Sequence, residues 1–275
     1  PVLGYSISQD FSGENMPDAL VYMLDGYAEQ ISEVISSKSL NSNRAKLQWA
    51  ELLAGNGTLL YKSVSSVDPL VSTTWDQAPY YNDLCPFDNQ YQQLTVSGCV
   101  ATAMSQIMKF WEHPAQGIGY HSYDHDTYGT QSANFSSQSY NWSAMPNNLN
   151  SSNEAVAIIM QHCGVAVDMD YGVAQTGGSA AYVISNASPV EHCVEYSLKE
   201  YFDYSTDMQG VIREYYDDAA WLQLMKTDLD AGRPIQYAGF GSGGGHTWVC
   251  DGHDNSNLFH MNWGWGGYAN GYFYL

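Results

Sequence analysis

Apolar residues recur at steps of three and four positions between Val100 and Glu112. Gln106 and Lys109 fall, with Glu112, on the opposite side from the apolar positions, which are Val100, Ala103, Met104, Ile107 and Trp111. This spacing predicts a helix with one buried face. Pro114 interrupts the pattern, so the helix is expected to end before it.

The same spacing predicts two further helices, over Met16–Ile35 and over Asn153–Cys163. A polar linker, Ser36–Asn43, follows the first of them, and another short helix is expected over Ala45–Leu53. Gly164–Gly172 comes directly after the helix at 153–163 and predicts a strand followed by a turn.

Near the C-terminal end, the apolar pattern changes to a period of two. His246–Asp251 alternates, Gly252–Asn257 is rich in turn residues, and Leu258–Trp263 has the composition of a second strand. These features predict an antiparallel hairpin. Helices followed by an antiparallel sheet indicate an α+β fold.

The register of this hairpin decides which side chains meet. Pairing Asp251 with Leu258 puts His246 opposite Trp263, and a shift of one residue puts Asn262 there instead. The sequence leaves both registers open. In either register, the amide oxygen of Asn262 is expected to accept a hydrogen bond from the imidazole of His246 and so to fix its tautomer.

Composition excludes some classes of partner. The 275-residue chain is 44% hydrophobic, which is enough for a large core, and carries a formal net charge of −20 at pH 7. That charge argues against binding to nucleic acid or to anionic membrane surfaces. No apolar run approaches the length of a membrane-spanning helix, so no membrane insertion is expected.

Cys99 stands between a turn-like stretch, Thr95–Gly98, and the predicted helix at 100–112. A helix start has free N–H groups and the positive end of the helix dipole, and both favour a reactive thiolate. An ordinary buried cysteine is the alternative. The glycine run before His246, at Gly243–Gly245, leaves the backbone open and suggests that a substrate approaches closely there. The alternative for His246 is a core histidine in a sheet rich in aromatic residues.

The four remaining cysteines are even in number, and they are Cys85, Cys163, Cys193 and Cys250. They allow two disulfides in three connectivities or four free thiols, and the sequence does not decide between these. Asp168 and Asp170 are interpreted as loop residues rather than calcium ligands. A zinc site from His162, Cys163, His192 and Cys193 has no ordinary zinc spacing, so neither a metal nor a cofactor is expected.

Four segments together resemble the C10 family of secreted bacterial cysteine peptidases. They are Gly98–Lys109, Val167–Gly172, Gly244–His246 and Phe259–Gly267, within a similarity that runs from roughly residue 75 to residue 274. Cysteine, histidine and asparagine follow one another as in papain-like proteases. The resemblance implies a papain-like, two-lobed α+β fold with a helical lobe and an antiparallel β lobe.

The same resemblance implies a role for individual residues. Cys99 is expected to be the nucleophile, His246 the base, Asn262 and Trp263 their supporting pair, and Gln77 a stabiliser of the oxyanion. The substrate-binding wall is expected at Gly178, Ser179, Ala180 and Gly245, where small side chains leave the backbone open to an extended peptide. A plain helix start capped by Ser179 is the alternative for that wall.

The resemblance also implies the organisation of the chain. Residues 1–44 are expected to be the C-terminal part of an inhibitory propeptide, with a boundary between Ser36 and Gly57, and residues 45–275 a catalytic domain that is incomplete at its C-terminus. The protein is expected to be a bacterial zymogen that is secreted, periplasmic or at the cell surface. It would cleave protein or peptide substrates as a cysteine endopeptidase; an amidase-like or inactive member of the scaffold is the alternative.

Overall fold

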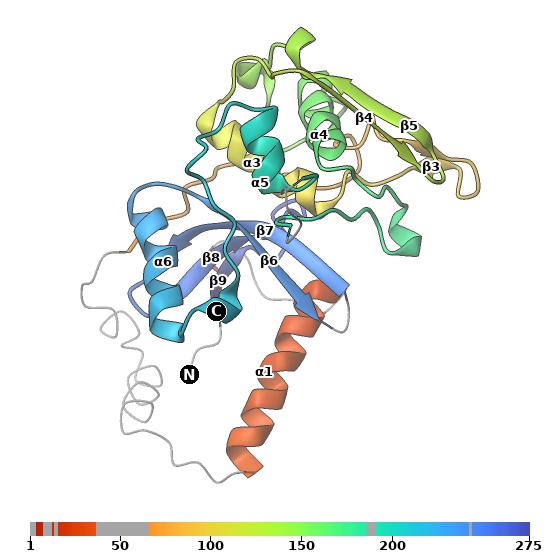
Figure 1. The fold of residues 1–275 in the computed structure, drawn as a ribbon. Coiled ribbons are helices and arrows are strands. Elements are labelled where there is room, and N and C mark those ends of the chain that lie inside the picture. The colour runs from red at the N-terminus through yellow and green to blue at the C-terminus, as the bar shows by residue number, and fades with distance from the viewer. Residues whose placement is uncertain (1–3, 8–12, 14–15, 37–65, 186–190, 242–243) are drawn as a thin grey trace.

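The structure is a computed structural model that describes residues 4–7, 13, 16–36, 66–185, 191–241 and 244–275. These residues form two lobes, one with several helices and a long hairpin, and one built on an antiparallel sheet (Figure 1). This arrangement confirms the α+β, two-lobed, papain-like fold expected from the sequence. The predicted short helix at 45–53 and most of the linker at 36–43 lie outside the described residues.

The helical lobe contains three α-helices and two small two-stranded sheets. Its elements are α3 (Cys99–Trp111), α4 (Glu154–Ala166), α5 (Val194–Glu200), β2 (Phe87–Asp88), β3 (Gln93–Leu94), β4 (Tyr120–His125), β5 (Gly129–Asn134) and the 3-10 helices η2 (Phe135–Ser137), η3 (Trp142–Ala144) and η4 (Ala174–Thr176). Strands β4 and β5 pair in register from Tyr120 opposite Asn134 to His125 opposite Gly129.

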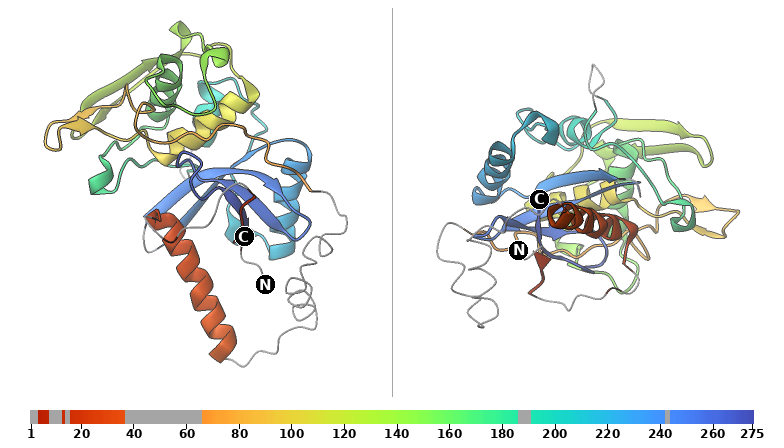
Figure 2. Two further views of the ribbon diagram at one scale, coloured as in Figure 1. Left: turned by 180° about the vertical axis from the view of Figure 1, so that it is seen from behind. Right: turned by 90° about the horizontal axis from the view of Figure 1, so that it is seen from below.

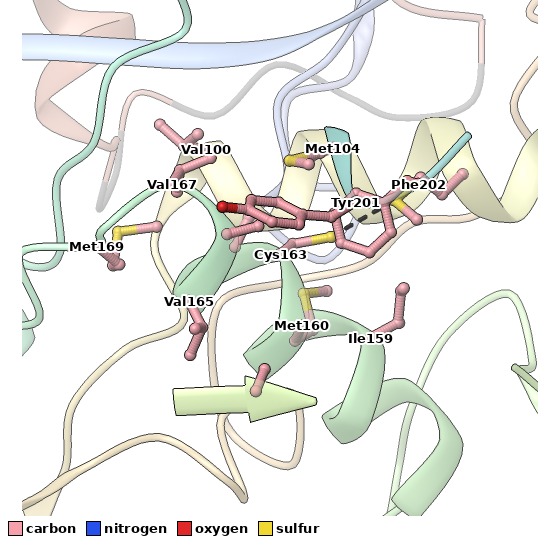
Figure 3. Packing of buried hydrophobic residues seen from close by; sticks show 14 of the residues in the cluster. Val100, Met104, Ile159, Met160, Cys163, Val165, Val167, Met169, Tyr201 and Phe202 are labelled. Atoms are coloured by element: carbon pink, nitrogen blue, oxygen red, sulfur yellow. Dashed lines mark hydrogen bonds between the residues drawn. The ribbon is translucent and has the colours of Figure 1, made fainter. Parts of the chain in front are cut away.

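The core of the helical lobe lies where α3 and α4 pack together. Cys163 of α4 is buried there among Met104, Met160 and Tyr201 (Figure 3). At the start of α4, the side chain of Asn153 accepts a hydrogen bond of 3.0 Å from the main chain of Val156, which caps the helix. The predicted helices at 100–112 and 153–163 are therefore confirmed.

The second lobe is a five-stranded antiparallel sheet in the order β1-β9-β8-β7-β6. The strands are β1 (Gly4–Tyr5), β6 (Ile235–Gly241), β7 (Gly244–His253), β8 (Leu258–Asn262) and β9 (Gly271–Tyr274). Helix α6 (Asp218–Asp230) follows η5 (Arg213–Tyr215) and buries Trp221, Met225 and Leu229 against this sheet. The sheet carries the core of this lobe.

Helix α1 (Asp18–Ser36) confirms the helix predicted near the N-terminus, and it lies on the sheet lobe, away from α3, α4 and α5 (Figure 2). Leu20 is 1% exposed and belongs to the core of the sheet lobe, while Ile35 is 71% exposed. The ring of Tyr22 packs so closely on Gly241, the last residue of β6, that a Cβ there would come within 1.9 Å of it. One end of α1 is thus fixed to the β6–β7 hairpin.

Helix α3 also joins the two lobes. Ala103 and Ile107 of α3 pack with Val71 and with Val249 of β7 in a separate buried cluster. Gln106, which the apolar pattern assigned to the polar side of this helix, is 0% exposed. That assignment was wrong because both sides of α3 face protein, one toward each lobe.

Between residues 164 and 181, one local prediction and one alternative interpretation do not match the structure. Helix α4 continues to Ala166, so the strand expected from Gly164 onward is reduced to an isolated antiparallel bridge between Asp170 and Ala180. Ser179 caps no helix: its hydroxyl donates 2.6 Å to the main-chain oxygen of Val96 and accepts 3.0 Å from the N–H of Gly172. Tertiary hydrogen bonds, rather than local propensity, shape this segment.

Candidate active site

Cys99 is the first residue of α3, and its position depends on the glycine before it. Gly98 has φ 87°, a left-handed conformation, and a Cβ there would lie 2.9 Å from the sulfur of Met169 and 3.1 Å from the Cβ of Ser179. Only glycine fits both the turn and this close approach. The chain therefore turns sharply into the helix and presents Cys99 at its N-terminal end, as predicted.

The Cys99 side chain keeps some solvent-accessible surface, although protein surrounds the sulfur on most sides. This burial raises the pKa of the thiol above its usual value, while the main-chain N–H groups of Thr247, Val100 and Cys99 itself oppose the shift. The helix start thus acts on the sulfur as expected, but its effect on the pKa is smaller than that of burial.

His246 lies in β7 and is 9% exposed. Its Nε2 donates 2.9 Å to the main-chain oxygen of Trp263, and the ring of Trp265 stacks on the imidazole with centroids 4.7 Å apart. Burial lowers the pKa of His246 to about 4, and the hydrogen bond to Trp263 opposes this shift. The imidazole is therefore neutral near pH 7 in this form.

The predicted partner of His246 is a different group in the structure. Val249 pairs with Asn262 and, beyond an irregularity at residues 250–252, His253 pairs with Phe259, so both predicted registers were wrong. Strand β7 continues to His253, beyond the predicted end at Asp251, and this moves Asn262 away from a position opposite His246. The imidazole bonds to the main chain of Trp263, one residue further on, and not to the Asn262 amide.

Cys99 lies beside β7, the strand that carries His246. The N–H of Thr247, directly after His246, reaches the Cys99 sulfur, and α3 packs against β7. Among the described residues, no hydrogen bond joins the Cys99 thiol to the His246 imidazole. A raised thiol pKa and a lowered imidazole pKa together mean a neutral pair rather than a thiolate–imidazolium pair.

A buried network of amides fixes the distance between these two elements. Asn262 donates 2.7 Å to the main-chain oxygen of Thr73 and exchanges hydrogen bonds of 3.3 and 3.4 Å with the side chain of Gln106. The Gln106 oxygen also accepts from the Thr73 hydroxyl and from the N–H of Trp75. Since Gln106 belongs to α3 and Asn262 ends β8, the network ties the cysteine helix to the histidine sheet.

The asparagine in this network leads to a first prediction. Asn262→Ala should lower the stability by roughly 2–4 kcal/mol, because it leaves the buried Gln106 amide and the Thr73 carbonyl without partners. Turnover should fall roughly ten- to a hundredfold as the main chain at Trp263 loosens. Urea unfolding and peptide hydrolysis measure the two effects; unchanged values of both would contradict the role of the network.

The lowered pKa of His246 leads to a second prediction. The unfolded imidazole takes up a proton as the pH falls below about 6.5, whereas the folded one resists until about pH 4, so this group contributes stability that is lost as the pH falls through that window. In a Cys99→Ala background, His246→Gln should reduce the slope of the unfolding free energy by up to roughly 1.4 kcal/mol per pH unit. Equal slopes in the two chains would contradict the buried neutral state.

Gln77 is held beside the cysteine turn through its main chain. Its carbonyl oxygen accepts hydrogen bonds from the N–H of Ser97, at 3.1 Å, and from the Ser97 hydroxyl, at 3.2 Å. Its side-chain amide makes no hydrogen bond with any residue that the structure describes. The amide is thus available to a ligand near Cys99.

The expected substrate wall also lies beside the cysteine turn. The Ser179 side chain lies close to Gly98 and donates a hydrogen bond to the main chain of Val96. A Cβ at Gly178 would lie 3.4 Å from the Val96 side chain, and Ala180 pairs with Asp170. A hollow of about 410 Å³ is lined by Ala78, Pro79, Tyr80, Asn82, Asp83, Gln93, Leu94, Val96, Ser152, Ala174 and Gln175, next to Gln77. Gly245 is exposed on β7, one residue before His246.

The structure also bears on the disulfides, the zinc site and the membrane span that the sequence raised. All five cysteines are free thiols. His162, one of the residues weighed for zinc, bonds through Nδ1 to the Tyr140 hydroxyl at 2.8 Å and packs in the core of the helical lobe, so the set with Cys163, His192 and Cys193 is not assembled. Within the described part of the chain, no helix combines the length and the apolar character that a membrane span needs.

Two residues of the site, Gln106 and Trp265, were not recognised from the sequence as contributing to it. Gln106 was assigned to the polar side of its helix, and the stacking of Trp265 on the His246 imidazole was not anticipated. The signal for Trp265 is the Gly264–Gly267 context: Gly264 has φ 74°, and a Cβ there would lie 3.1 Å from Thr102 of α3. Small residues let this loop pack on the cysteine helix and place the indole over His246.

Comparison with known proteins identifies the family of this chain. The sequence profile of the peptidase C10 family matches residues 75–273. Thiol protease/hemagglutinin PrtT of Porphyromonas gingivalis is 31% identical over 284 residues, which cover 100% of this chain and 31% of PrtT. Streptopain of Streptococcus pyogenes is 30% identical over 298 residues, which cover 100% of this chain and 68% of streptopain. This chain thus spans about a third of PrtT's length.

Two solved structures from Prevotella intermedia resemble this chain. A prointerpain A fragment has a TM-score of 0.77 at 30% identity, covering 99% of this chain and 81% of the fragment. Active wild-type interpain A has a TM-score of 0.68 at 34% identity, covering 78% of this chain and 87% of its own. Both relatives therefore share the two-lobed fold.

Proposed function

Because this chain belongs to the peptidase C10 family, we propose that it is a cysteine endopeptidase with Cys99 as nucleophile and His246 as general base. The observation that supports the proposal is the position of the cysteine beside the histidine strand: Cys99 starts α3, His246 lies on β7, and the N–H of Thr247 reaches the sulfur. Hydrolysis of an internally quenched peptide, with the products sequenced, tests the reaction; cleavage of side-chain or terminal amides alone would refute it.

The tautomer of His246 assigns the two ring nitrogens different tasks. Nε2 donates to the Trp263 carbonyl, which cannot accept the proton outright, so Nδ1 is left as the base. Nδ1 takes the thiol proton of Cys99 as the sulfur attacks the scissile carbonyl and forms the C–S bond. Trp263 supports the histidine through its main chain, and Asn262 positions Trp263 through the amide network.

The remaining steps release two products. The Gln77 amide and a main-chain N–H at the start of α3 stabilise the oxyanion. The imidazolium of His246 gives its proton to the departing amine as the C–N bond breaks, and a thioester remains on Cys99. Water, deprotonated by His246, then attacks the thioester and regenerates the thiol. An extended substrate would pair with the backbone of Gly178, Ser179 and Ala180, with Gly245 opposite.

We also propose that residues 1–44 belong to a propeptide and that residues 45–275 form the catalytic domain. Prointerpain A covers 99% of this chain, whereas active interpain A covers 78%, which supports a separable N-terminal part. Helix α1 buries Leu20 in the sheet lobe and packs Tyr22 on the β6–β7 hairpin, whose second strand carries His246. The neutral state of the dyad is consistent with an inhibited form.

Location is part of the same proposal. The relatives come from the bacteria Porphyromonas gingivalis and Streptococcus pyogenes, and we place this protein outside the bacterial cytoplasm, secreted or at the cell surface. Its substrates would be proteins or peptides, and its own N-terminal segment would be its first partner. Fractionation of the producing bacterium with an antibody against the catalytic domain tests the location.

The propeptide proposal gives a third prediction. Removal of residues 1–44 should raise kcat/KM at least about tenfold, and a synthetic 1–44 peptide added in trans should inhibit the shortened enzyme, because α1 binds the sheet lobe through its buried face. N-terminal sequencing during activation should show loss of this segment.

Two matched peptides sharpen this test. Leu20→Ala should weaken inhibition at least tenfold, because a fully buried leucine is truncated. Ile35→Ala should leave inhibition unchanged, because Ile35 is largely exposed. Full activity of the chain with Pro1 still attached, together with no inhibition by the peptide, would show that α1 is a structural helix of the catalytic domain.

A further inference from the structure

A second cluster of chemically capable side chains lies in the helical lobe, away from Cys99 and His246. His121 of β4, Asp168 after α4 and His192 before α5 each offer one ligand atom, and these three atoms all lie within 4.8 Å of one another. The three residues come from segments far apart in sequence. They form the one group of this kind among the described residues.

The carboxylate of Asp168 lies between the two imidazoles. One of its oxygens contacts Nε2 of His121, and the other lies 3.0 Å from Nδ1 of His192. The two imidazole rings stack with centroids 5.4 Å apart and planes inclined by 30°, and the ring of Tyr201 stacks on that of His121 at 5.6 Å. Both rings are thus held with a nitrogen directed at the same small space.

Hydrogen bonding alone does not account for this arrangement. Nδ1 of His192 is buried and makes no hydrogen bond with any described residue, despite its 3.0 Å distance from Asp168. A buried ring nitrogen that faces a carboxylate without an aligned hydrogen bond is poorly satisfied, and a metal ion between the two groups would bind both. The Nε2 of His192 lies 3.5 Å from the Glu191 carboxylate, which is the orienting partner that metal-bound histidines commonly have.

We propose that His121, Asp168 and His192 bind a zinc ion. Two imidazoles and one carboxylate are a donor set that zinc accepts, with the remaining position open to water. Tetrahedral zinc places its ligand atoms on the order of 3.3 Å apart, so small side-chain movements complete the site. Calcium prefers a shell of oxygen ligands and is disfavoured by the two nitrogens.

The ion would tie the substrate wall to the rest of the helical lobe. Met169, next to Asp168, packs under Gly98, and its carbonyl accepts 2.6 Å from the Tyr123 hydroxyl. Asp170 pairs with Ala180 in both directions at 2.9 Å. An ion bound at Asp168 would therefore lie one residue from Met169, which packs at the cysteine turn, and two residues from Asp170, which pairs with Ala180 of the wall.

The test uses the Cys99→Ala chain, because the Cys99 thiol with His246 would itself attract zinc. Titration calorimetry with Zn²⁺ should give one ion per chain, and Co²⁺ should give visible d–d bands of a four-coordinate site. His121→Gln and His192→Gln should each weaken zinc binding at least roughly a hundredfold, more than loss of an outer-shell partner costs. His113→Gln, which lies outside the cluster, should bind as the parent does.

A stability measurement separates binding from a folding defect. Zinc should raise the melting temperature of the parent and of His113→Gln by several degrees, and should not raise that of Asp168→Asn, which retains the size of the side chain and tolerates the left-handed backbone at φ 51°. The proposal is overturned if the folded Cys99→Ala chain binds no zinc, or if the histidine variants bind it with the affinity of the parent.

Discussion

Cys99→Ala is expected to abolish peptide hydrolysis while the fold persists. The substitution removes the sulfur that would form the acyl-enzyme and only a small volume, at a site where the main-chain N–H groups of Thr247 and Val100 remain in place. The rate should fall at least about a thousandfold, to the level of the uncatalysed background. Initial rates with an internally quenched peptide measure this loss, and circular dichroism checks the fold.

The chain provides its own control for this substitution. Cys85 is also a free thiol and is buried in the core of the helical lobe, where burial raises its pKa to about 12. Cys85→Ala should therefore change stability rather than chemistry, and the folded fraction should retain the parent rate. Activity of Cys99→Ala above roughly a tenth of the parent rate would move the nucleophile to another cysteine.

The second large effect is expected from His246→Gln, which should lower kcat by roughly 10²- to 10⁴-fold. Glutamine can still donate to the Trp263 carbonyl, so the hydrogen bond that holds this side chain can be kept while the base is lost. The pH dependence of kcat/KM should lose its acidic limb in the variant, because no imidazole remains to titrate.

The control for His246 is a second histidine of the same sheet that has no role in the proposed reaction. The side chain of His260 is largely buried, and its Nδ1 lies 2.6 Å from the carboxylate of Asp251. His260→Gln should alter stability and leave the pH profile of the folded enzyme in its original form. If His246→Gln retained the parent pH profile, the general base would have to lie elsewhere.

The sequence predicted those elements whose residues lie close together along the chain. The helix from Val100 onward, the turn at Gly98 and the placing of Cys99 between them all follow from local spacing. The two-lobed fold followed from the resemblance to the C10 family. Such features depend on local periodicity or on a shared pattern, and both are visible before any contact is known.

Tertiary contacts decided what the sequence could not predict. Gln106 looked solvated on a helical wheel, yet it is buried because α3 has a lobe on either side. Asn262 lies away from His246 because β7 continues to His253 and the turn comes later than the residue types indicated. The approach of His121 to Asp168, 47 positions away, follows from β4 packing beside α4, and no local pattern encodes that approach.

The central claim is that Cys99 is the catalytic nucleophile of a cysteine endopeptidase, and labelling of the activated enzyme with a peptidyl fluoromethyl ketone tests it most directly. Such a reagent needs both a reactive thiol and the neighbouring imidazole. The account predicts one adduct per chain, mapped by mass spectrometry to the peptide that contains Cys99, formed in step with the loss of activity and absent from Cys99→Ala. An adduct on Cys85, Cys163, Cys193 or Cys250, or full activity after Cys99 is completely labelled, would contradict it.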